Sequence, residues 1–95
     1  MKLLTLVYDE ALEDQITAVF QRSMAVTRYT KIEGVVGARM DALAESDYAT
    51  DRRNNVILVV ADEQTMELIV RELRALREQI GHGMRGVVTR AEALI

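Results

Sequence analysis

Two apolar runs, each of strand length and each followed by an aspartate and a helical pattern, constrain the fold of this chain most strongly. The runs are residues 2–8 (KLLTLVY) and 54–61 (NNVILVVA). Continuous apolar runs of this length are typical of strands in the middle of a sheet. The chain has 95 residues, which is enough for one domain built from one small sheet and its covering helices.

Each run leads into an amphipathic helix. Asp9 is a predicted N-cap for a helix over about residues 10–23, and Asp62 is one for a helix that ends at Gly81. Helical spacing relates the apolar residues Leu12, Ile16, Val19 and Phe20 in the first helix, and Met66, Ile69, Val70, Leu73, Leu76 and Ile80 in the second. The other side of the first helix is predicted to be polar, with Glu13, Asp14, Gln15 and Gln21.

Two further strands are predicted from composition. Residues 25–36 are rich in β-branched residues, and Gly34 and Gly37 near the end of that run favour a bulge or a sharp exit. Residues 84–90 (MRGVVTR) form the last predicted strand. Residues 38–53 have no clear period and are predicted to be a long loop, of a kind that is often functional.

The resulting order predicts an α+β, ferredoxin-like βαββαβ fold. Its antiparallel four-stranded sheet carries both helices on one face. The strands nevertheless look apolar on both faces, especially at residues 56–60 (VILVV). Something must therefore cover the second face, and we expect a further copy of the chain, in a homo-oligomer.

Composition excludes several classes of function. The chain has no cysteine, which fits a reducing cytoplasm, and no segment approaches the length of a membrane span. A net charge of −3 and few aromatic residues argue against nucleic acid as a partner. His82 is the single histidine, so we expect no site for a soft or borderline metal. No catalytic motif is present, so we do not expect an enzyme.

Two glycine pairs are the remaining candidates for a ligand site. Gly34 and Gly37 precede the predicted loop, and Gly81 and Gly83 flank His82 before the last strand. Glycine lets backbone N–H groups approach an anion closely, although Gly81 also suits a helix end. Arg85 beside them is suited either to a phosphate or to a salt bridge.

The chain resembles the PII superfamily and is most similar to divergent PII-like signalling proteins. The resemblance covers nearly the whole chain and rests on the element order, on residues 24–37 (MAVTRYTKIEGVVG) and 73–94, and on the long loop. It implies one domain over residues 1–95, assembled as a homotrimer. It also implies a T-loop-like segment at 38–53 that contacts partner proteins, and a B-loop-like turn at 81–84. An adenine nucleotide is then expected in each cleft between subunits.

Residue by residue, Tyr29-Thr30 matches the strand that lines the base, Gly37 matches the root of the T-loop, and Gly81 and Gly83 match the B-loop glycines. The predicted ligand contacts are Thr30, Gly37, Gly81, Gly83 and Arg85. The predicted partner contacts in the loop are Arg39, Asp47, Tyr48 and Arg52. Met84 stands where the family has a B-loop lysine, and residues 91–95 contain no counterpart of the family's arginines after the last strand.

These observations predict a cytoplasmic regulatory protein without a permanent cofactor. The resemblance implies that its effector is ADP, AMP, ATP or bicarbonate and that its partner is a regulated enzyme or membrane transporter. One alternative is a trimeric docking module that binds no nucleotide. Two others are a small dimeric α/β-barrel enzyme that uses His82 and an amino-acid-binding regulatory module of similar topology.

Overall fold

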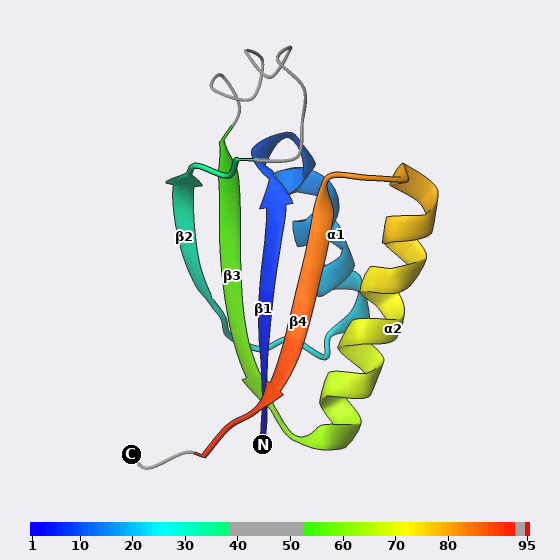
Figure 1. The fold of residues 1–95 in the computed structure, drawn as a ribbon. Coiled ribbons are helices and arrows are strands. Elements are labelled where there is room, and N and C mark those ends of the chain that lie inside the picture. The colour runs from blue at the N-terminus through cyan, green and yellow to red at the C-terminus, as the bar shows by residue number, and fades with distance from the viewer. Residues whose placement is uncertain (39–52, 93–94) are drawn as a thin grey trace.

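The computed structural model describes residues 1–38, 53–92 and 95. In chain order, these residues form β1 (Lys2–Asp9), a 3₁₀ helix (Glu10–Leu12), α1 (Glu13–Ser23), β2 (Thr30–Val35), β3 (Asn54–Ala61), α2 (Glu63–Ile80) and β4 (Met84–Arg90). The four strands form one antiparallel sheet in the order β2-β3-β1-β4, and Figure 1 shows both helices on one side of it. The predicted ferredoxin-like fold is confirmed.

The two central strands alternate between a buried face and an open face. Leu4, Leu6 and Tyr8 of β1 lie on the helix side with Ile57 and Val59 of β3, and all five are buried. They pack against apolar residues of the two helices, namely Ile16, Val19, Phe20, Met66, Ile69, Leu73 and Leu76. This alternation, set by the two-residue period of a strand, places the whole core between the sheet and the helices.

The opposite face of the sheet is apolar and is not covered by any element in the part of the chain that the structure describes (Figure 1). It is formed by Leu3, Thr5 and Val7 of β1, Val56, Leu58 and Val60 of β3, Thr30 and Ile32 of β2, and Arg85, Val87 and Thr89 of β4. We call these residues the open face. The predicted apolar character of both faces is thereby confirmed.

The ends of α2 agree with the sequence prediction. The Asp62 carboxylate accepts a hydrogen bond from the Thr65 backbone N–H at 2.7 Å, and Gly81 ends the helix with a φ of +84°. Asp9 caps the 3₁₀ turn that precedes α1, through the backbone N–H of Ala11. Neither helix in the described chain is long and apolar enough to cross a membrane.

The predicted strand over residues 25–36 was wrong at its start. Strand β2 begins at Thr30, because α1 ends only at Ser23 and Met24 then takes the left-handed conformation that turns the chain. Within the connection, Ala25 and Val26 pack against the core, and the ring of the exposed Tyr29 lies 5.6 Å from that of Phe20. The predicted bulge at Gly34 is present as a register shift between Ile32 and Val35.

Candidate functional site

The turn before β4, the end of β1 and the start of β3 lie at one end of the sheet. Tyr8 pairs with Met84, and Asp9 pairs with Asn54, which also pairs with Val35 at the end of β2. Strand β2 ends and strand β3 begins at this same end (Figure 1). Loops that cluster at one end of a rigid scaffold are a common location for binding sites.

Gly81 acts as the helix terminator that the sequence predicted. Its backbone N–H donates to the Arg77 carbonyl oxygen at 2.8 Å. The Arg77 side chain in turn donates from Nε to the Met84 carbonyl oxygen at 2.9 Å and from a terminal nitrogen to the Gly81 carbonyl oxygen. Arg77 therefore fixes both ends of the 81–84 turn.

Gly83 is favoured by its backbone conformation, and the space beside it is tight. Its φ is +89°, and a Cβ atom there would lie 3.2 Å from Cδ1 of Leu12 and 3.7 Å from Cβ of Asp9. Its carbonyl oxygen accepts a hydrogen bond from the Asp9 backbone N–H at 2.8 Å. These contacts account for the glycine without a ligand, and its role in binding stays a prediction.

Met84 and Arg85 point to opposite faces of the sheet. Met84 is only 7% exposed and belongs to the core, whereas Arg85 is exposed on the open face, opposite Val7. Strand β4 therefore begins without a bulge. Arg85 does not take the position of Met84, where the family has its B-loop lysine.

Thr30 and Gly37 lie at the opposite edge of the sheet from β4, in and just after strand β2. Thr30 opens β2 and is exposed opposite Leu58 of β3. Gly37 follows β2, and a Cβ atom there would lie 2.8 Å from the side-chain nitrogen of Asn54. Thus Gly37 and Gly83 both lie at the end of the sheet where β2 ends and β4 begins.

The structure does not bring all predicted ligand contacts together in one chain. Strands β2 and β4 are the two edges of the sheet, with β3 and β1 between them. Three strand spacings separate those edges by about 14 Å. Thr30 is therefore remote from Gly81, Gly83 and Arg85 of the same chain. The predicted partner contacts Arg39, Asp47, Tyr48 and Arg52 lie outside the described residues.

A polar network that the sequence analysis missed lies beside the same end of the sheet. The Glu13 carboxylate accepts hydrogen bonds from the Tyr8 hydroxyl at 2.6 Å and the Asn55 amide at 2.8 Å. It also accepts one from Lys31 Nζ at 2.8 Å and one from the Thr17 hydroxyl at 3.2 Å. We call these five side chains the Glu13 network, which joins α1 to β1, β2 and β3. The sequence placed Glu13 on the polar side of the first helix but did not indicate these partners.

The Glu13 network also holds the strands that flank residues 36–53. Asn55 is 4% exposed, and its side-chain oxygen accepts a hydrogen bond from the Gly34 backbone N–H at 3.3 Å. Polar Asn55 and Tyr8 at inward positions of otherwise apolar strands were the sequence signal for such a network. The signal does not name the partner, because Glu13 lies 42 residues from Asn55 along the chain.

Partial burial alone would raise the pKa of Glu13, but the hydrogen bonds from Lys31, Tyr8, Asn55 and Thr17 outweigh it and lower the pKa from 4.5 to about 2. Burial, followed by the bond to Glu13, raises the pKa of the Tyr8 hydroxyl. The bond to Glu13 likewise raises the pKa of Lys31. Glu13 and Lys31 are therefore an ion pair at neutral pH, and Tyr8 is a neutral donor.

We expect the stability contributed by Glu13 to be lost in acid. Since its folded pKa lies below its unfolded pKa, the contribution is complete above pH 4.5 and falls as the pH drops toward about 2. Between about pH 6 and about pH 3, the protein should lose about 2 kcal/mol of unfolding free energy relative to the Glu13→Gln variant. Urea unfolding of both proteins across this range measures the difference, and parallel pH profiles would contradict the prediction.

Among the residues that the structure describes, no cluster of three or more His, Cys, Asp or Glu side chains is arranged to hold a metal ion. His82 is exposed, and its Nδ1 lies 3.2 Å from the Ile80 carbonyl oxygen. That contact is made to the backbone, so it does not supply the carboxylate partner that orients a catalytic histidine.

No protein-family model matches the chain, and no curated protein matches its sequence. The fold, in contrast, is similar to several solved structures. CPII from Thiomonas intermedia K12, a nitrogen regulatory PII-like protein, superposes with a TM-score of 0.69 in a structure bound to ADP, AMP and acetate. That alignment has 18% identity and covers 92% of this chain and 81% of CPII.

Two further structures have the same fold. A PII-like signaling protein from Thermus thermophilus is 21% identical with a TM-score of 0.58, over 93% of this chain and 83% of that one. A DUF3240 family protein from Shewanella baltica is 10% identical with a TM-score of 0.71, over 97% and 90% of the two chains. With the element order and sheet topology described above, these similarities identify a divergent PII-like fold.

Proposed function

We propose that residues 1–95 form one PII-like domain and that three copies assemble through their open faces. The assembly senses a small metabolite in the clefts between subunits. Residues 38–53 then transmit the signal to a regulated protein, such as an enzyme or a membrane transporter. The effector is an adenine nucleotide, and bicarbonate is a second candidate.

The separation of the predicted ligand contacts is the observation that supports this proposal most directly. Thr30 and the Gly81–Arg85 turn lie on opposite edges of one sheet, which favours a site where Thr30 of one chain meets the turn of a second chain. In the proposed trimer, the edge strand β2 of one copy lies beside the edge strand β4 of the next copy. Small-molecule sites are frequent at such junctions.

The effector class follows from the fold comparison and from the turn. CPII has been solved with ADP and bicarbonate bound, and with ADP, AMP and acetate. In this chain, the turn after α2 has two glycines of positive φ and leads to an exposed arginine. Such a turn can present backbone N–H groups to a phosphate, with Arg85 as a charged partner. Ligand contacts at Gly37 would then favour one arrangement of the 38–53 segment and change its fit to the partner.

We expect ADP to raise the melting temperature of the purified protein in a concentration-dependent way. A ligand that binds only the folded state stabilises it by about 2.7 kcal/mol at one hundred times its dissociation constant. The thermal shift is measured with ADP, AMP, ATP, cyclic AMP and bicarbonate, and the mass in solution is measured alongside. An assembly other than a trimer, or a trimer that none of these compounds stabilises, would contradict the sensor proposal.

Arg85→Ala tests the turn directly, and Arg90→Ala is its control. Both arginines are exposed on β4, but Arg90 lies at the far end of the strand, opposite Lys2. Arg85→Ala should weaken nucleotide binding by about tenfold and leave the mass unchanged, because it removes a charge-assisted hydrogen bond. Equal affinities of the two variants in calorimetry would remove Arg85 from the site.

A docking module without nucleotide is the second candidate, and the burial of Met84 favours it. The position that carries a lysine in the family's Gly-x-Gly-Lys turn is here part of the core, so it supplies no charge to a phosphate. On this alternative, the trimer forms, nucleotides leave its melting temperature unchanged, and deletion of residues 39–52 abolishes partner binding.

A further inference from the structure

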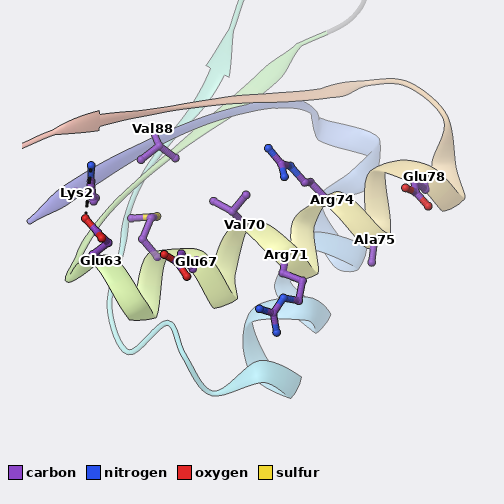
Figure 2. Close-up of a pocket in the computed structure, with 10 residues that line it drawn as sticks. Lys2, Glu63, Glu67, Val70, Arg71, Arg74, Ala75, Glu78 and Val88 are labelled. Atoms are coloured by element: carbon purple, nitrogen blue, oxygen red, sulfur yellow. Dashed lines mark ion pairs between the residues drawn. The ribbon is translucent and has the colours of Figure 1, made fainter.

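A small hollow lies on the helix side of the sheet, between α2 and the edge strand β4. It has a volume of about 270 Å³, and its walls include Leu4, Leu6, Val70, Gly86 and Val88 together with Arg74 and Arg77. We call it the α2–β4 hollow. It shares Val70, Arg74 and Val88 with a wider groove of about 770 Å³ along the same helix (Figure 2).

The floor of the hollow is apolar, and a glycine keeps it open. Gly86 pairs with Leu6 and belongs to the helix side of β4. A Cβ atom at Gly86 would lie 3.3 Å from Cδ1 of both Leu4 and Leu6, so any side chain there would occupy the space. Figure 2 shows Val70 of α2 and Val88 of β4 directed toward each other across the gap.

The charged wall of the hollow is basic only. Its lining contains three arginines and no carboxylate. Arg85 belongs by register to the open face, so the guanidinium groups on the helix side are those of Arg74 and Arg77. They stand three residues apart on one face of α2, where side chains are neighbours.

Both arginines keep N–H groups that make no hydrogen bond within the described residues. Arg77 uses two of its five N–H groups on the carbonyl oxygens of Met84 and Gly81. Arg74 makes no side-chain hydrogen bond or ion pair within residues 1–38 and 53–92. Its guanidinium is directed toward the strands in Figure 2, whereas Arg71, one turn earlier, is directed away from them.

We infer that the α2–β4 hollow binds a small organic carboxylate with an apolar body. The carboxylate would meet Arg74 and the remaining donors of Arg77, and the apolar body would lie on Leu4, Leu6, Val70 and Val88. One negative charge matches the guanidinium of Arg74, and the volume lies just below the range of about 300–1,000 Å³ that is common for ligand pockets. The hollow adjoins the 81–85 turn, since Arg77, Met84 and Arg85 are among its lining residues, but it opens on the helix side of the sheet and the inference does not rest on nucleotide binding.

Hexanoate is the probe for the first experiment, with hexanol and hexylammonium as neutral and cationic controls of similar size. The full chain is titrated by NMR, and the methyl signals of Leu4, Leu6, Val70 and Val88 are followed. We expect hexanoate to shift these signals in a saturable way, to bind at least about tenfold more tightly than either control, and to keep its affinity when ADP is added.

Three variants test the assignment. Arg74→Gln should weaken hexanoate binding about tenfold or more, and Val88→Phe should abolish it by filling the hollow. Arg71→Gln removes an equal charge from the neighbouring turn and should leave the affinity unchanged. Melting curves check that each variant is folded.

Any one of four results would overturn the inference. Equal losses in Arg74→Gln and Arg71→Gln would mean general attraction to a basic helix. Equal affinities for hexanoate and hexanol would mean apolar contact alone. Displacement of hexanoate by ADP, or an absence of saturable shifts, would mean that no separate carboxylate site exists.

Discussion

Glu13→Ala is expected to lower the free energy of unfolding by about 2–4 kcal/mol. The variant leaves the Lys31 ammonium without the carboxylate at 2.8 Å, and it removes the acceptor of the Tyr8 hydroxyl and the buried Asn55 amide. Breaking a fully buried ion pair costs about 3–5 kcal/mol. The lower value expected here reflects the 27% exposure of the Glu13 side chain, which lets water replace part of the lost bonding.

Glu33→Ala is the matched control for this experiment. Glu33 also contacts Lys31, at 3.6 Å, but its side chain is 70% exposed. A surface pair of this kind contributes at most about 1 kcal/mol. Urea unfolding at one fixed protein concentration compares both variants with the parent, since assembly would add to the measured stability. Equal losses in the two variants would show that the Glu13 network contributes no more than a surface pair.

The Glu13 network also bears on the proposed function, because it holds the two strands next to the proposed partner-binding segment. The Glu13 network holds Asn55, which follows residues 39–52, and through Asn55 it holds Gly34, which precedes them. A change in Glu13 should therefore alter the two strands that carry the proposed partner-binding segment.

Leu58→Asp is expected to convert the proposed trimer into single chains. Leu58 lies in the middle of the open face, beside Thr5 of β1 and Thr30 of β2. A carboxylate there has no cation opposite it in this register, and burying an unpaired charge in an apolar interface costs several kcal/mol. Light scattering should report a fall from three times the chain mass to 10.7 kDa.

Leu68→Asp is the control, because Leu68 is 47% exposed on α2, away from the open face. This variant should keep the mass of the parent protein. If Leu58→Asp also keeps it, the open face is not the assembly surface, and the proposed site between β2 of one chain and β4 of another fails with it. If Leu58→Asp is a folded single chain, nucleotide binding should be lost too, because Thr30 no longer meets the 81–85 turn.

The sequence was sufficient for the elements whose signals are local. Strand β3 and helix α2 were predicted nearly to the residue. The apolar run of β3 stops at Asp62, which caps the start of α2, and the apolar stripe of α2 stops at Gly81, which ends the helix. The element order then left the four-stranded sheet with helices on one face as the simplest fold. The apolar character of the open face followed from the same runs.

Tertiary structure decided the features that depend on residues far apart in the chain. The sequence placed Glu13 on the polar side of a helix, and only the structure shows that it binds Lys31 and Asn55, which lie 18 and 42 residues away. Residues 25–29 looked like a strand, but they lie outside the sheet, with Ala25 and Val26 against the core and the Tyr29 ring beside Phe20. Sheet order alone put Thr30 and Arg85 on opposite edges and opened a hollow at Gly86. Local patterns report the average surroundings of one element, whereas these properties depend on which elements become neighbours.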